Sequence, residues 1–165
     1  PGGGGGDSTD PNLVEFRIRA GIGNGAWNTA ASAVLVFPGQ TLRIFNDDTI
    51  AHRLRTPGAP CPQQPANMAP NQSYDCVINS AHAATATDLY DFNAGATAIF
   101  YVNSMDGQVL YGTACAGCHG TFNASEKKGA SFTGIKNAIA GNVGGMGNIN
   151  LNDNQLRAIA HALSR

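Results

Sequence analysis

The stretch Leu110-Tyr111-Gly112-Thr113-Ala114-Cys115-Ala116-Gly117-Cys118-His119-Gly120 decides how the second half of this chain folds. Its Cys-x-x-Cys-His spacing is typical of covalent c-type haem attachment. Two thiols three positions apart near a helix end each reach one vinyl group on the same porphyrin edge, and the adjacent imidazole then lies under the iron. The motif therefore predicts thioether bonds from Cys115 and Cys118, with His119 as the proximal axial ligand.

Two other chemistries use closely spaced cysteines. A zinc ribbon needs a second Cys/His pair of similar spacing, but the only other cysteines, Cys61 and Cys76, stand far apart in the sequence. A thioredoxin-like motif accompanies a βαβ pattern, and none precedes Cys115. The haem interpretation is therefore favoured over both.

The composition indicates a globular protein rich in turns. Hydrophobic residues make up 42% of the 165 positions and charged residues 13%, with 21 Gly and 8 Pro, and a disordered chain would carry more charge. The formal net charge of −1 gives no reason to expect nucleic acid or an anionic membrane as a partner. No apolar run approaches the length of a transmembrane helix, and the length allows one domain or two small ones.

The two cysteines outside the motif suggest an oxidising compartment, so we expect a periplasmic or extracytoplasmic protein. Cys61 and Cys76 flank a proline-rich loop at residues 62–70 that has little else to hold it. We expect a disulfide between them, which closes a loop of about 15 residues and contributes roughly 3 kcal/mol through the unfolded state. Two separate buried thiols are the alternative.

The first ten residues, Pro-Gly-Gly-Gly-Gly-Gly-Asp-Ser-Thr-Asp, predict a flexible tether because they offer nothing to bury. A tether suits a protein that is held to a membrane by a lipidated residue upstream. An artificial extension is the alternative, and the sequence does not separate the two.

Residues 11–103 are predicted to be all-β. From Leu13 the period is two, since Val14, Phe16 and Ile18 alternate with Glu15, Arg17 and Arg19. Further strands are expected at residues 33–37, 41–45, 50–55, 73–78, 88–92 and 97–102. Several short strands with regular turn signals indicate a sandwich or barrel.

The order of features in residues 11–103 resembles the cupredoxin family. The resemblance rests on Phe37-Pro38-Gly39-Gln40-Thr41-Leu42-Arg43-Ile44-Phe45-Asn46, then His52, then the closing Leu89-Tyr90-Asp91-Phe92. It implies a Greek-key sandwich in which His52 falls on a copper-binding histidine. The place of the family's ligand Cys holds Asp91, however, and the loop Asn93-Ala94-Gly95-Ala96 has no Cys, His or Met. We therefore expect the fold without type 1 copper, and His52 as a vestigial copper position.

Helical signals begin after Val102. One helix is expected at residues 107–114, leading into the haem motif, and a second at 131–140, with Gly141 just past its end. The last helix has the clearest start: Asn152 and Gln155 form a capping box, and Leu151 and Leu156 a hydrophobic staple. A helix this short is marginal alone, so it is expected to dock on the first helix and the haem.

Residues 104–165 resemble a compact class I cytochrome c domain. The matching features are a helix ending in Cys-x-x-Cys-His-Gly, the glycine-rich Gly144-Gly145-Met146-Gly147, and the terminal amphipathic helix. The resemblance implies His119 and Met146 as the two axial ligands. Met68 and Met105 are rivals for the distal position, and a core methionine in a loop is the alternative for Met146.

These features predict an electron carrier rather than an enzyme, with one covalent haem c and with redox partner proteins as donor and acceptor. The β domain would be a copper-free docking or adaptor module. The alternatives are a haem enzyme or sensor, which needs distal acid–base residues, and a copper–haem relay or copper-handling module. Lys127, Lys128 and Lys136 mark either a docking surface or a solvated face, and His82 is expected to be an exposed loop residue.

Overall fold

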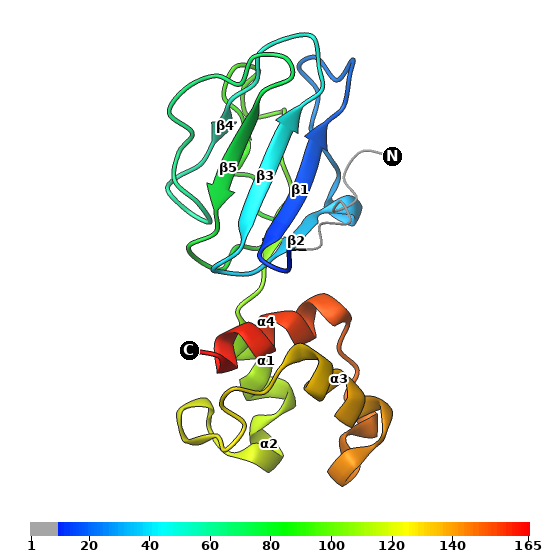
Figure 1. Ribbon diagram of the computed structural model, residues 1–165. Helices are drawn as coiled ribbons and strands as arrows, with labels where there is room; N and C mark the ends of the chain where they lie inside the picture. The colour runs from blue at the N-terminus through cyan, green and yellow to red at the C-terminus, as the bar shows by residue number, and fades with distance from the viewer. Residues whose placement is uncertain (1–9) are drawn as a thin grey trace. The chain divides into compact units, whose positions relative to one another are not determined.

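The computed structural model describes residues 10–165. The predicted tether of residues 1–10 lies, except for its last residue, outside the described part. The chain divides into two compact units, one ending at Ser104 and the other spanning Met105–Arg165. We call them the β unit and the helical unit, because the described strands belong to the first and the α-helices to the second (Figure 1).

The β unit is built from short strands in three small sheets. The strands are β1 (Leu13–Ile18), β2 (Val34–Val36), β3 (Thr41–Asn46), β4 (Leu54–Arg55), β5 (Ser73–Val77), β6 (Tyr90–Asp91) and β7 (Val102–Ser104). β3 lies between β1, to which it runs parallel, and β5, to which it runs antiparallel (Figure 1). β2 pairs with β7 in parallel, and β4 pairs with β6 in antiparallel register.

The alternation read from the sequence places the core of this unit. Phe16 and Ile18 of β1 and Leu42 and Ile44 of β3 are buried, while the residues between them face outward, as the pleat of a strand requires. Trp27, the only tryptophan of the chain, is buried in the same cluster.

The prediction of a strand at residues 97–102 is wrong for most of that range. Only Val102 of that range belongs to a strand, and Ile99 forms no more than an isolated bridge with Tyr90. At Tyr101 a side chain takes part in the pairing, while the Tyr101 carbonyl also accepts from the Val34 N–H at 3.0 Å. The Asn28 Oδ1 accepts from the Tyr101 N–H at 2.7 Å, and the Asn28 amide donates to the Tyr101 carbonyl at 2.9 Å. The strands expected at 50–55 and 88–92 are likewise reduced to β4 and β6.

The disulfide between Cys61 and Cys76 is confirmed, with Cα atoms 5.5 Å apart. Both residues are buried. Cys76 belongs to β5, so the bridge fastens the proline-rich loop to the three-stranded sheet.

The helical unit contains four α-helices and two 3₁₀ segments. These are α1 (Gly107–Ala114), α2 (Ala116–His119), a 3₁₀ turn at Phe122–Ala124, α3 (Phe132–Ala140), a 3₁₀ segment at Val143–Asn148 and α4 (Asp153–Leu163). None of the helices formed by the described residues is long and apolar enough to span a bilayer.

Side-chain caps set the helix starts. Asp106 accepts from the N–H groups of Gln108 and Val109 at the start of α1, which satisfies donors that have no partner inside the helix. The capping box of Asn152 and Gln155 is confirmed at the start of α4. Gly141 is the C-cap of α3 with φ −85°, so it does not take the left-handed conformation of the usual terminating glycine.

α1 and α4 pack at very close range where Gly107 meets α4. A Cβ atom on Gly107 would overlap the backbone carbonyl of Ala158 and touch the Cβ of Ala162. The crossing therefore admits no side chain at position 107. Buried Leu156, Ile159 and Leu163 give α4 its apolar face, and the expected docking of α4 on α1 is confirmed.

Replacing Gly107 by alanine is expected to lower the free energy of unfolding of the helical unit by about 1–3 kcal/mol, the usual cost of overpacking. Urea unfolding followed by far-ultraviolet circular dichroism measures the change. Gly112→Ala is the matched control on the same helix, because a Cβ there meets no atom within 4 Å. It is expected to be neutral or mildly stabilising, and equal losses in the two variants would contradict the close crossing.

Candidate functional site

The helical unit contains a partly open cavity of about 480 Å³, within the usual range of about 300–1,000 Å³ for ligand pockets. It is lined mainly by apolar side chains from α1, α3, α4 and the 3₁₀ segment. The residues of the sequence motif are also in its wall: Cys115, Cys118, His119 and Met146.

The haem motif forms the end of one helix and a single further turn. Cys115 caps the C-terminus of α1, with its N–H donating to the Tyr111 carbonyl, and α2 then makes one turn from Ala116 to His119. Gly120 ends that turn at φ 75°, a left-handed conformation that glycine adopts without a steric cost. The Cys115 thiol is buried, which raises its pKa, whereas Cys118 is exposed.

Met146 stands in a backbone segment that its glycines shape. Gly144 and Gly145 have φ values of 60° and 87°, which residues with a Cβ rarely adopt. The Asn142 side chain accepts from the Gly147 N–H at 2.8 Å and steadies the far side of the loop. Of the chain's methionines, Met146 alone lines the cavity, since Met68 is buried in the core of the β unit and Met105 is absent from the wall.

α3 presents part of its apolar face to this cavity, while Ile135 also packs against the buried cluster of the helical unit. The helix has no fully buried residue, yet Ile135 and Ala138 line the cavity. A flat, largely apolar macrocycle suits such a lining, and an imidazole and a thioether are a donor set used for haem iron. The residues present therefore fit a haem held by the motif.

The three lysines considered from the sequence differ in their surroundings. Lys127 contributes to the cavity wall, while the ammonium group of Lys128 lies 3.6 Å from the centre of the Phe122 ring. Lys136 forms an exposed ion pair with Asp153 at 2.8 Å. The three lysines therefore differ in their contacts, and they do not form a single group of charges without partners.

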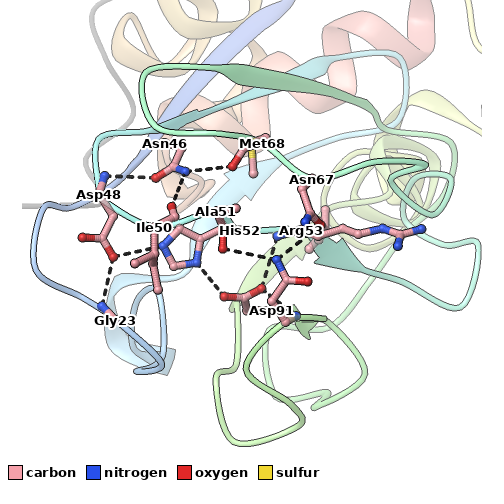
Figure 2. Close-up of polar contacts among 12 residues, drawn as sticks. Gly23, Asn46, Asp48, Ile50, Ala51, His52, Arg53, Asn67, Met68 and Asp91 are labelled. Carbon is pink, nitrogen blue, oxygen red and sulfur yellow. Dashed lines mark hydrogen bonds and ion pairs between the residues drawn. The ribbon is translucent and has the colours of Figure 1, made fainter.

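In the β unit, His52 is fully buried between two carboxylates (Figure 2). Its Nδ1 lies 2.6 Å from Oδ2 of Asp91, and its Nε2 lies 3.1 Å from Oδ2 of Asp48. Both aspartates are also buried. Each ring nitrogen is thus within hydrogen-bond distance of one carboxyl oxygen, and neither nitrogen faces solvent. We call these three residues the His52 cluster.

Backbone N–H groups hold the Asp48 carboxylate in its charged form. Burial acts to raise its pKa, but hydrogen bonds from the N–H groups of Thr49, Gly21 and Gly23, together with the His52 ring, outweigh burial and lower the pKa from 3.8 to about 2. The Asp91 carboxylate accepts further bonds from the N–H groups of Arg53 and Asn93.

Asn46 at the end of β3 braces the same region. Its side-chain amide donates to the carbonyls of Ile50 and Met68, and its Oδ1 accepts from the Asp48 N–H (Figure 2). His52 and Met68 also exchange two backbone hydrogen bonds. The end of β3 and the loops around it are thus joined into one polar network.

Sequence reasoning identified His52 and Asp91 and missed Asp48. The signal was weak, because an Asn-Asp-Asp run is ordinary turn chemistry.

The expectation for His82 was wrong. Its side chain is only 7% exposed, because Nδ1 bonds the Val102 carbonyl at 3.0 Å and Nε2 bonds Asp88 at 2.7 Å.

Comparisons with known proteins find similarity among solved structures. No protein-family model matches the chain, and no curated protein matches it. Among solved structures the chain is similar to a purple cupredoxin from Nitrosopumilus maritimus, with 13% sequence identity and a TM-score of 0.39. The match covers 55% of this chain and 98% of that protein.

Proposed function

We propose that the chain is an electron-transfer protein that carries one covalently attached haem c in its helical unit, which would then have the cytochrome c fold. The observation that carries the proposal is that Cys115, Cys118, His119 and Met146 line one cavity. They come from two segments of the sequence: His119, in the first, and Met146, in the second, are 27 positions apart (146 − 119). Two thiols, an imidazole and a thioether around one apolar cavity are the complete set of side chains that such a cofactor needs.

A bound haem would supply a one-electron couple, and the chain's residues determine how that couple is used. His119 and Met146 would occupy both axial positions, which leaves no site for a substrate on the iron. A thioether ligand raises the reduction potential compared with a second imidazole. Among the described residues that line the cavity, the titratable side chains are His119, the two motif thiols, Tyr111 and Lys127. This lining supports a carrier over a haem enzyme, which needs acid–base groups at the iron.

One covalent haem per chain is the expected composition. A reduced-minus-oxidised optical spectrum and an intact mass under denaturing conditions measure it. The double variant Cys115→Ala/Cys118→Ala is the control, since it removes both thioether bonds and should release any haem under those conditions. A wild-type mass without haem, after expression with the haem-attachment machinery, would contradict the proposal.

We further propose that the β unit has a cupredoxin-like Greek-key fold and acts as a copper-free docking or adaptor module for redox partner proteins. A type 1 copper site needs two histidines and a thiolate. In this unit both cysteines are in the disulfide, and the ring nitrogens of His52 are held by Asp48 and Asp91. A periplasmic or extracytoplasmic location is part of the proposal, with a lipid tether upstream as one means of attachment.

Cu(II) is accordingly expected not to form a type 1 centre in the full-length protein. After incubation with one equivalent of Cu(II) and removal of loosely bound metal, electron paramagnetic resonance should show no copper signal with the narrow hyperfine splitting of a thiolate site. A stoichiometric signal of that kind would refute the proposed copper-free role. A weak signal with wide splitting reports only nitrogen and oxygen ligands on the surface and agrees with it.

A further inference from the structure

The hydroxyl group of Tyr111 contacts the end of the haem motif. Tyr111 is 1% exposed on α1, and its hydroxyl lies 3.3 Å from the His119 carbonyl and 3.2 Å from the Gly120 carbonyl. It also lies 2.7 Å from Oγ of buried Ser125, which in turn accepts from the Lys127 N–H at 3.0 Å. One side chain therefore joins α1, the end of α2 and the segment that follows.

The motif turn needs support of this kind. α2 is a single turn, and isolated turns are unstable because nucleation costs more than one hydrogen bond returns. The carbonyls of His119 and Gly120 are beyond the reach of a further helical turn, since Gly120 turns the chain into the left-handed region. Among the described residues, the Tyr111 hydroxyl is the side-chain donor within reach of these carbonyls, and its one proton is shared between them and Ser125 Oγ.

The imidazole of His119 makes no hydrogen bond of its own to any residue in the described part of the chain. Metal-binding histidines usually donate their second ring nitrogen to a partner that fixes the ring. Without such a partner, the orientation of the ring depends on its side-chain torsions and on the position of the His119 backbone, which the contacts to its peptide hold.

We propose that Tyr111 is a positioning residue for the proximal ligand: its hydroxyl fixes the His119–Gly120 peptide and, through it, the plane of the His119 imidazole. This inference rests on the proposed haem function of the same cavity. It assigns the hydroxyl a role separate from that of the ring, which packs edge-on against Phe122 with centroids 5.5 Å apart.

The phenylalanine variant separates the two roles, because Tyr111→Phe keeps the ring and removes only the hydroxyl. In the haem-loaded, full-length protein, the His119 and Gly120 amides, which donate to Cys115 and Ala116, are expected to exchange hydrogen roughly tenfold faster, as the loss of about one hydrogen bond implies. The Leu156 amide in α4 should exchange at the wild-type rate.

Proton nuclear magnetic resonance of the oxidised protein gives the second readout. The shifts of the four haem methyl groups depend on the orientation of the axial imidazole plane, so their order and spread are expected to change in Tyr111→Phe. A merely stabilising contact would leave this pattern as it is. Thr113→Val is the matched control, since it removes a hydroxyl from the same helix that bonds only the carbonyls of Val109 and Leu110.

Ser125→Ala provides an independent test if Tyr111→Phe fails to fold or to load haem. It removes the hydroxyl partner at 2.7 Å and should move the methyl shifts in the same direction by a smaller amount. Wild-type methyl shifts and exchange rates in every variant that loads haem would overturn the role of Tyr111 while leaving the proposed function intact. A wild-type protein without covalent haem would overturn the proposed function itself.

Discussion

Replacing Met146 by alanine is expected to abolish the far-red charge-transfer band that a methionine–iron bond gives the oxidised protein. The reduction potential should fall by on the order of 0.1 V or more, a part of the roughly 0.8 V range that axial ligands span. The reason is that the thioether favours ferrous iron, whereas water or another ligand in its place does not. Optical spectroscopy and a potentiometric titration measure the two effects.

Met105→Ala is the matched control for this experiment, because Met105 is the other methionine of the helical unit and does not line the cavity. Its spectrum and potential should equal those of the wild type. If Met146→Ala retained both the band and the potential, the distal ligand would have to be another residue. Covalent attachment through Cys115 and Cys118 would be unaffected by that result.

The replacement Asp91→Ala is expected to lower the free energy of unfolding of the β unit by about 3–5 kcal/mol, because it leaves three hydrogen-bonding groups unpaired at about 1–3 kcal/mol for each buried group. The change removes the carboxyl group that lies 2.6 Å from the ring of buried His52. It also leaves the N–H groups of Arg53 and Asn93 without their acceptor. Urea unfolding followed by the fluorescence of Trp27 measures the loss, since this tryptophan lies in the core of the same unit and its ring contacts the His52 ring edge-on.

Asp75→Ala is the control for Asp91→Ala. Asp75 forms a 2.8 Å ion pair with Arg43, but its side chain is 46% exposed, and exposed pairs contribute at most about 1 kcal/mol. The two variants remove the same group from the same unit at different depths. A similar small loss in both would mean that the His52 cluster is not an energetically important centre.

The helical unit was largely predictable because its signals are local. Capping by Asn152 and Gln155, the spacing of the motif and the glycines before Met146 each act within a few residues. Such features are readable from one sequence, and the structure placed α1 and α4 close to the expected bounds. The close contact of Gly107 with Ala158 was not foreseen, since it depends on how two helices cross.

The β unit was less predictable because side chains distant in sequence take part in its pairing. Asn28 bonds both backbone groups of Tyr101, 73 positions away (101 − 28), and shares the carbonyl with the Val34 N–H, in a stretch that the residue pattern had favoured as a strand. The His52 cluster joins Asp91 of β6 to His52 and Asp48 of one distant loop, and Asp48 was not anticipated because its Asn-Asp-Asp run is ordinary turn chemistry. His82 was misjudged because the partners of its ring are a remote carbonyl and a loop carboxylate.

The two cysteine pairs of the chain require opposite chemistry during biosynthesis. Cys61 and Cys76 must be oxidised, whereas Cys115 and Cys118 must stay reduced until the proposed thioether bonds form. The order of the pairs along the chain separates these demands, since a nascent protein emerges from its N-terminus and domains generally fold as units. Cys61 and Cys76 can pair and become buried before the motif thiols emerge.

A buried disulfide is out of reach of an attacking thiolate, and the raised pKa of Cys115 makes it a slower attacker still. The fold of the β unit would thus protect the later maturation of the helical unit from mispaired disulfides.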